Sequence, residues 1–320
     1  MLSRRHLRIK ALQALYAFNR SNSPELMVGE KNMLRSTEKI YELVIRQLSF
    51  MVEIARFAEI RIEEGKKKYY PTEEDLNPNT KFVENQLIKK ISDNRDYVKR
   101  MNAYRINWVD EVEAVRKVFN AVKESQDYKR YMNSGESTFD GDKKYLISLF
   151  KYLLADNEYL TSYYEEMDIY WADDIDTANV LVLKIMKGMQ QNHDVFEPFP
   201  SLYNETGKDV IDEDKKFLKE LYRKTILKSD EFESMIASKA SNWELDRIAV
   251  MDVLLLKMAL AELLEFPSIP VKVTMNEYID LSKYYSTPKS RVFINGVLDK
   301  MIADLKKENR IVKAGRGLIE

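Results

Sequence analysis

A strongly apolar stretch of the chain runs over residues 243–264, WELDRIAVMDVLLLKMALAELL. Few of its positions are polar, and Pro267 and Pro270 follow shortly after it. A helix that is apolar around most of its circumference is buried among other elements. We therefore expect this segment to form the central helix of the fold.

Other segments also show helical spacing of apolar residues. Nine glycines and eight prolines are few for a chain of 320 residues, which disfavours a turn-rich β architecture. Ser290 precedes a periodic segment and is expected to cap its helix. The sequence predicts an all-α fold, with helices at residues 4–19, 30–66, 82–131 (broken near residue 94), 272–284 and 290–307.

Composition and motifs argue against most catalytic and metal-binding classes. The chain has no cysteine and two histidines, so disulfides, thiolate metal sites and a His-built metal centre are not expected, although carboxylates could hold magnesium or calcium. No glycine-rich phosphate loop, paired-cysteine zinc pattern or nucleophile elbow is present. We expect neither a cofactor nor enzymatic activity.

The start of the chain resembles a targeting signal only briefly. Residues 1–6, MLSRRH, are basic, but Arg8, Lys10 and Gln13 interrupt the apolar stretch that a signal peptide needs. No run approaches the roughly 20 apolar residues of a membrane span. A cytoplasmic protein with no membrane partner is therefore expected.

An internal repeat relates two parts of the chain. Residues 142–146, DKKYL, are echoed by residues 214–218, DKKFL, and the same offset pairs Trp171 with Trp243. Chance similarity between amphipathic helices is the alternative. The matched tryptophans favour duplication of one helical unit.

The first 24 residues carry a local basic excess, although the whole chain has a net charge of −1. They contain five basic residues and no acidic one: Arg4, Arg5, Arg8, Lys10 and Arg20. On a helix, Leu7, Ala11, Leu15 and Phe18 share a face that is expected to pack on the core, whereas Arg5, Leu12 and Tyr16 fall within one narrow arc away from it. Arginine offers phosphate a bidentate donor fork, and tyrosine offers a base a flat face. The alternative is a solvated basic helix end.

A second basic patch opens the last helix, at Lys289, Ser290, Arg291 and Phe293. Free backbone N–H groups at a helix start favour a phosphate. Phe293 lies off the core stripe and could stack with a base. The alternative is an aromatic residue packed at the rim of a neighbouring helix.

Two segments resemble the NusB family of transcription antitermination factors. The first is RRHLRIKALQALY, residues 4–16. The second extends from WELDR at residue 243 through ALAEL and IPVKVTMNE to SRVFINGVLDK at residues 290–300. The Asn-Glu pair at 276–277, followed by Phe-x-Asn-Gly-Val-Leu-Asp-Lys, is the most specific part of this resemblance.

The resemblance implies a NusB-like helical bundle interrupted by an inserted helical domain, because this chain is longer than typical members. Residues 1–24 would form the RNA-binding helix, residues 25–205 a helical insertion with a partial repeat at 142–189, residues 206–310 the core helices, and residues 311–320 a flexible basic tail.

The resemblance also implies a function. The chain would bind boxA-like single-stranded RNA together with NusE, a small-subunit ribosomal protein, in an RNA polymerase antitermination complex that reads through terminators in ribosomal RNA operons. Asp246 and Asp252 would contact NusE, although Val253 replaces a common arginine. The implied RNA contacts are Arg4, Arg5, His6, Arg8, Tyr16, Lys289, Ser290, Arg291 and Phe293.

Two of these positions depart from the family pattern. Lys289 stands where many members carry an acidic residue, which should raise general RNA affinity. His6 stands where an arginine is common, which weakens phosphate contact near neutral pH because histidine is then mostly uncharged.

Two alternatives keep the fold and change the function. NusB-like domains also occur in ribosomal RNA cytosine methyltransferases, but no Rossmann-type catalytic domain follows in this chain. The chain could otherwise be a protein-interaction scaffold without RNA binding. The RNA-binding hypothesis requires the two basic patches to lie on the same side of the molecule, since one short RNA must touch both.

Overall fold

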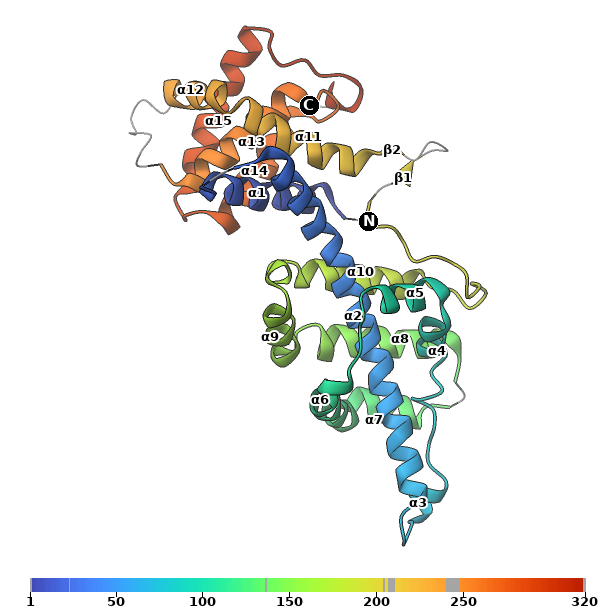
Figure 1. Ribbon diagram of the computed structural model, residues 1–320. Coiled ribbons are helices and arrows are strands. Elements are labelled where there is room, and N and C mark those ends of the chain that lie inside the picture. The colour runs from blue at the N-terminus through green and yellow to red at the C-terminus, as the bar shows by residue number, and fades with distance from the viewer. Residues whose placement is uncertain are drawn as a thin grey trace. The chain divides into compact units, whose positions relative to one another are not determined.

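The computed structural model describes residues 2–22, 24–135, 137–203, 205–206, 211–239 and 248–318. The regular secondary structure of these residues is helical apart from one pair of two-residue antiparallel strands, which confirms the predicted all-α class. The chain divides into two compact units (Figure 1). Unit 1 is Glu38–Leu202, and unit 2 combines Leu2–Thr37 with Tyr203–Glu320.

Unit 2 is built around one buried helix. Its elements are α1 (Arg4–Arg20), the start of α2 (Leu26–Lys66), β1 (Glu205–Thr206), β2 (Ile211–Asp212), α11 (Glu213–Leu227), α12 (Ser229–Lys239), α13 (Val250–Glu265), α14 (Val271–Tyr285), α15 (Ser290–Lys307) and the short 3-10 helix η5 (Gly315–Leu318). Helix α13 packs against α1, α11, α12, α14 and α15 (Figure 1). Its residues 254–263 are all buried, as a central helix requires. Residues 243–247 of the predicted helix lie outside the described residues.

Helix α1 starts where the Ser3 hydroxyl accepts a hydrogen bond from the His6 backbone N–H at 3.3 Å. Leu7, Ala11 and Leu15 are buried as expected. Leu12 is also fully buried, so the prediction that it shares an exposed arc with Arg5 and Tyr16 is wrong. The reason is that α1 packs against both α11 and α13, which widens its buried stripe.

Unit 1 holds the rest of α2 and the helices between it and residue 202. These are α3 (Glu73–Leu76), α4 (Gln86–Asp93), α5 (Arg95–Ala103), η1 (Val109–Glu111), α6 (Val112–Glu124), α7 (Gln126–Asn133), α8 (Phe139–Leu149), the π-helical η2 (Phe150–Leu154), α9 (Glu158–Met167), η3 (Ile169–Trp171) and α10 (Ile175–Gly188). Ile40, Val44, Leu48 and Met51 of α2 are buried in its core.

The boundary between the units falls inside α2, and unit 1 is slightly shorter at both ends than the insertion expected at residues 25–205. The repeated positions occupy matching environments: Asp142 and Leu146 in α8 and Asp214 and Leu218 in α11 are all buried. This agreement supports duplication, which remains a hypothesis because Trp243 lies outside the described residues.

The described part of the C-terminal tail is attached to unit 2. The Ala314 N–H donates to the Pro267 carbonyl, and the Lys313 ammonium donates to the Phe266 carbonyl, both at 3.0 Å. These bonds occupy backbone carbonyls beyond the end of α13, so residues 313–314 do not extend freely as expected. Within the described part of the chain, no helix has the length and apolar character needed to cross a membrane.

Candidate nucleic-acid interface

A buried ion pair joins the first helix to the centre of unit 2. Arg8 is only 2% exposed, and its Nε and Nη2 donate to the two carboxylate oxygens of Glu262, each at 2.8 Å. The hydroxyls of Thr274 and Tyr278 donate to the same carboxylate at 2.8 and 3.2 Å. One fully buried carboxylate thus connects α1, α13 and α14.

The protonation of this cluster follows from its surroundings. Burial lowers the pKa of Arg8, but the hydrogen bonds and charge of Glu262 outweigh it and hold the pKa above its ordinary value. Burial, reinforced by the charge of Glu262, raises the pKa of Tyr278 well above its ordinary value. Arg8 is therefore a charged structural residue, and the prediction that it contacts RNA gains no support here because the protein encloses its guanidinium.

The other basic residues at the start of α1 also have partners. The Arg4 Nε lies 3.0 Å from an Asp214 carboxylate oxygen, and its guanidinium carbon lies 4.4 Å from the centre of the Phe217 ring. His6 Nδ1 forms a 2.7 Å hydrogen bond with the Ser3 hydroxyl. The sequence shows the basic residues of this segment but not the carboxylates that compensate them.

Arg5 of the same helix is half-exposed, and its side chain reaches α14. Its Nε donates to Glu277 at 3.0 Å, and its Nη2 donates to Asp280 at 2.9 Å. The hydrogen bond to Glu277 raises the pKa of Arg5 above its ordinary value despite partial desolvation. Among the described residues Nη1 has no hydrogen-bond acceptor, so one edge of the fork remains available.

A surface hollow of about 540 Å³ lies between α14 and α15. It is lined by Asn276, Ile279, Asp280, Lys283, Arg291, Val292 and Asn295. Asp280, which accepts from Arg5, therefore borders the same hollow as Arg291. The structure brings Arg5 of the first patch and Arg291 of the second to the same part of α14, as a shared RNA site would require.

The start of α15 carries the uncompensated positive charge of this region. Lys289 and Arg291 are exposed, and neither makes an ion pair with any described residue. Val292 beside them is 77% exposed, and Phe293 is half-buried. Unlike Arg4, Arg5 and Arg8, which pair with carboxylates, these cations are open to an anionic ligand.

Tyr16 lies further along α1. It is 39% exposed, and the Arg20 guanidinium carbon lies 5.5 Å from its ring centre. Tyr16 lies eleven positions after Arg5 on this helix, which corresponds to roughly 16 Å along its axis. A ligand that touched both would have to follow α1.

Two predicted contacts are buried. Ser290 is the first residue of α15 rather than its cap, and its hydroxyl donates to Asp252 at 2.8 Å. Both side chains are enclosed at the junction of α13 and α15. The predictions that Ser290 contacts RNA and that Asp252 contacts NusE therefore gain no support as direct contacts, because both side chains are buried. Asp246 lies outside the described residues.

Comparison with known proteins identifies the family. A Salinibacter ruber protein named transcription antitermination protein NusB is 45% identical over 112 residues, which are 34% of this chain and 70% of that protein. The chain belongs to the NusB family. The NusB family model matches residues 176–303, which confirms the resemblance seen in the sequence.

Two further relatives carry the same name. The Chloroherpeton thalassium NusB protein is 36% identical over 124 residues, 37% of this chain and 59% of that protein. The Koribacter versatilis NusB protein is 34% identical over 103 residues, 32% of this chain and 70% of that protein. No solved structure matches the chain. The NusB match includes α14 and α15, whereas α1 lies outside the residues that the family model covers.

Sequence reasoning missed Glu262, the acceptor at the centre of the buried cluster. An acidic residue inside so apolar a helix was the available signal, because a buried carboxylate needs donors or a paired cation. It missed Asp280 as well, for which the sequence offers no comparable signal.

Proposed function

We propose that this NusB-family protein is a transcription antitermination factor that binds boxA-like single-stranded RNA together with NusE. Its relatives are named transcription antitermination proteins, which supports the general role. The observation that carries the RNA proposal is that Arg5 of α1 and Arg291 of α15 lie near the same stretch of α14: Arg5 donates to Asp280, and Asp280 and Arg291 line one hollow. A complex of this kind would promote read-through by RNA polymerase in ribosomal RNA operons.

In this proposal the start of α15 supplies the main RNA contacts. Lys289 and Arg291 bind phosphate, and arginine can do so through two parallel hydrogen bonds. The amides of Asn276 and Asn295 at the hollow offer donors and acceptors to a base edge. Phe293, which is half-buried near this helix start, would stack with a base in this proposal.

The carboxylates around α1 limit how strongly the protein binds RNA by itself. Arg4 and Arg5 face Asp214, Glu277 and Asp280, which repel phosphate. With about two or three phosphates neutralised, the affinity should fall with salt at a log–log slope of roughly −1.4 to −2. Because this electrostatic contribution to RNA affinity is modest, we expect NusE to tighten binding by adding RNA contacts that the paired arginines of α1 do not make.

The same carboxylates favour a second candidate, a protein-interaction scaffold that does not bind RNA. A surface on which arginines are already paired with carboxylates can bind a protein partner as readily as it binds RNA. Charge reversal at Arg291 separates the candidates, because only RNA binding depends on an unpaired cation at that position.

The test is fluorescence anisotropy of a labelled boxA-like RNA with the full chain, with and without NusE, at low and high salt. Arg291→Glu and Phe293→Ala should each weaken binding by about tenfold, corresponding to the loss of one charge-assisted or stacking contact. Lys123→Glu, a matched charge reversal at an exposed position of α6, should leave binding unchanged. Absence of RNA binding with and without NusE would favour the scaffold.

A further inference from the structure

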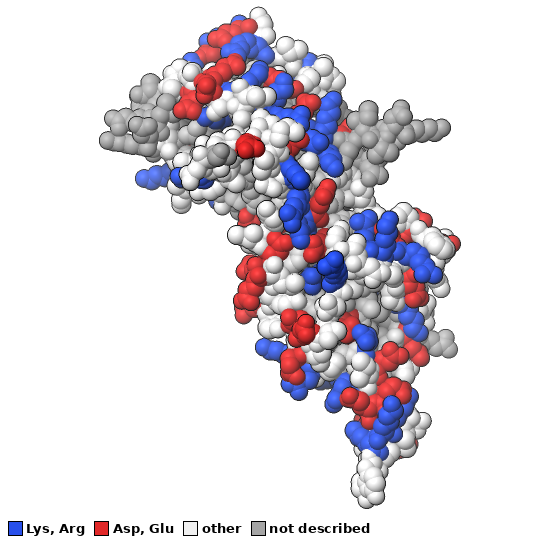
Figure 2. Space-filling model, viewed as in Figure 1, with Lys and Arg blue, Asp and Glu red and all other residues white. Residues whose placement is uncertain are grey.

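One face of unit 1 is strongly acidic. Between Tyr152 and Leu183 the chain contains eight acidic residues and no lysine or arginine. Glu158, Glu165 and Glu166 of α9 are exposed and form no ion pair with any described residue. Figure 2 shows red side chains gathered over the position of α9 in Figure 1.

Exposed apolar side chains lie at the end of α9 and on the neighbouring elements η3, η1 and α6. Ile169 of η3 is 85% exposed, and Met167 and Tyr170 beside it are also exposed. Val109 and Val112, at the start of η1 and of α6, are 75% and 50% exposed. A single exposed apolar side chain is ordinary, but several gathered on one face mark an interaction site.

Contacts beneath these residues show that η1 and α9 adjoin. The Trp108 ring, which precedes η1, lies 5.8 Å from the Tyr163 ring of α9. The charge of Glu111 in η1 acts on Tyr163, where it adds to burial in raising the tyrosine pKa. The Tyr164 ring in turn lies 6.5 Å from Trp171 of η3. The exposed residues thus stand on one connected aromatic layer.

This layer is fixed to the core of unit 1. The Trp108 indole N–H donates to the Ser49 hydroxyl at 3.0 Å, and the Trp171 indole N–H donates to the Lys39 carbonyl at 2.9 Å. Both tryptophans are buried. The surface above them is therefore supported by anchored side chains, which lowers the entropy lost on binding.

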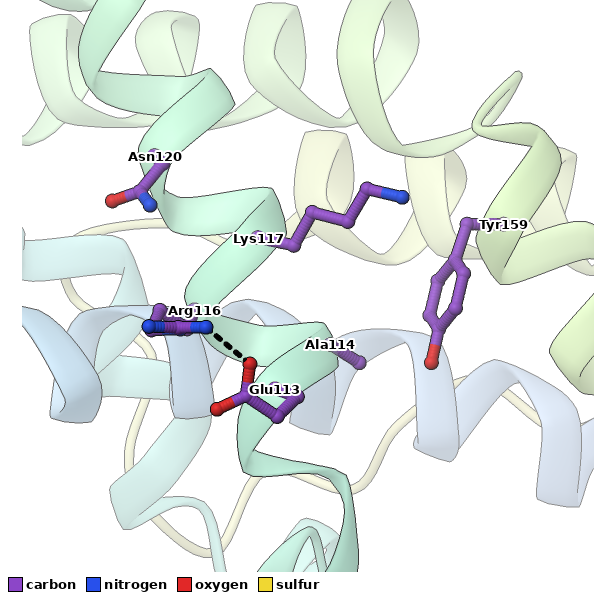
Figure 3. Close-up of a pocket in the computed structure, with 6 residues that line it drawn as sticks. All are labelled: Glu113, Ala114, Arg116, Lys117, Asn120 and Tyr159. Carbon is purple, nitrogen blue, oxygen red and sulfur yellow. Dashed lines mark hydrogen bonds and ion pairs between the residues drawn. The ribbon is translucent and has the colours of Figure 1, made fainter.

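A hollow of about 300 Å³ between α6 and α9 continues this surface. Figure 3 shows the Tyr159 ring across from Lys117, whose ammonium lies 5.4 Å from the ring centre, with Ala114 between the two helices. Glu113 forms an ion pair with Arg116 at its edge. An aliphatic side chain of a partner could enter beside Tyr159.

We propose that the face formed by η1, α9 and η3 is a docking surface for a protein segment that carries lysine or arginine with aliphatic residues between them. Glu158, Glu165 and Glu166 attract the basic residues, and Val109, Met167 and Ile169 cover the aliphatic ones. Such a face repels RNA and anionic membrane lipids. The proposal concerns unit 1 alone and does not depend on RNA binding by unit 2.

The test measures binding of labelled peptides to the full chain by fluorescence anisotropy. The probe is a short peptide of repeating Lys-Leu-Ser, and its comparators replace lysine with glutamate or leucine with glycine. The double variant Glu165→Lys/Glu166→Lys and the single variant Ile169→Asp alter the face. Matched controls make the same changes in α3, at Glu73, Glu74 and Leu76, which are exposed and lie away from α9 in Figure 1.

The Lys-Leu-Ser peptide should bind best, and the face variants should each weaken it by about tenfold, while the α3 variants leave it unchanged. Binding should also weaken with salt. Equal weakening by the α3 variants, or equal affinity for the glycine peptide, would overturn the proposal by reducing it to general charge attraction. A native dimer that Ile169→Asp makes monomeric would overturn it too, because a second copy would then cover the face.

Discussion

Replacing Arg8 with methionine should destabilise unit 2 by about 3–5 kcal/mol, because it leaves a buried carboxylate without its cation. Glu262 is fully buried and accepts four hydrogen bonds, two of them from Arg8 at 2.8 Å. Methionine fills similar volume but donates nothing. The remaining hydroxyls of Thr274 and Tyr278 cannot neutralise a charge in this environment.

The double variant Arg8→Met/Glu262→Gln separates loss of the charge pair from loss of packing. Glutamine keeps an acceptor for the Thr274 and Tyr278 hydroxyls and removes the buried charge. We expect the double variant to recover about half of the loss caused by Arg8→Met, since no unpaired charge remains. The two single changes should therefore be strongly non-additive.

The assay is urea denaturation followed by circular dichroism. The two units can unfold in separate transitions, so hydrogen exchange of α13 amides assigns the transition that belongs to unit 2. A loss below about 1 kcal/mol for Arg8→Met would refute the reasoning, because that is the size of a surface ion pair. Simple additivity in the double variant would refute it as well.

Three further predictions test other contacts. Ser290→Ala should lower the free energy of unfolding by about 1–3 kcal/mol, because it leaves the buried Asp252 carboxylate without its hydroxyl donor; an unchanged melting temperature would contradict this. Gly29→Ala should destabilise unit 2 by about 1–3 kcal/mol, because a Cβ would lie 2.0 Å from the Tyr222 hydroxyl oxygen. Tyr222→Phe should relieve the clash at little cost, since that hydroxyl has no hydrogen-bond partner among the described residues, and failure of this rescue would refute the contact. The Lys68 ammonium lowers the pKa of Asp75 to about 2. The stabilisation from this carboxylate should therefore be complete above its ordinary pKa and be lost as the pH falls from about 4 through 2. A midpoint near 4 in a carbon NMR titration of Asp75 would show that the contact with Lys68 does not form.

The helices of unit 2 could be predicted because the spacing of apolar residues in each segment matches the side of the helix that is buried. Apolar periodicity located α1 and α14 to within a residue or two, and it identified α13 as the central helix. The beginning of α2 was placed four residues late, at residue 30 instead of Leu26. Periodicity is weakest at helix ends, where side chains need not face the core.

Whether each basic residue is exposed or paired with a carboxylate could not be predicted, because this depends on contacts between distant parts of the chain. Arg8 and its acceptor are separated by 254 positions, and Arg5 and Asp280 by 275. Helical spacing places a residue on a face but does not tell whether another helix covers that face or supplies a carboxylate. Leu12 was misplaced for the same reason, since α1 is covered on two sides.

The position of the boundary between the two units could not be predicted from local sequence patterns either. Helix α2 runs from Leu26 to Lys66, yet its residues up to Thr37 belong to unit 2 and those from Glu38 belong to unit 1. No turn residue marks this boundary, because the helix continues through it. The nearest turn-forming residues in the sequence are SNSP at positions 21–24, well before the boundary.

Photo-crosslinking of a 4-thiouridine-substituted boxA-like RNA to the full chain, followed by peptide mass spectrometry, tests the RNA-binding surface most directly. The account predicts crosslinked peptides from the start of α15, around Phe293, and from α1, around Tyr16, which competing unlabelled RNA suppresses. Crosslinks confined to unit 1, or none above those of an unrelated RNA, would contradict it.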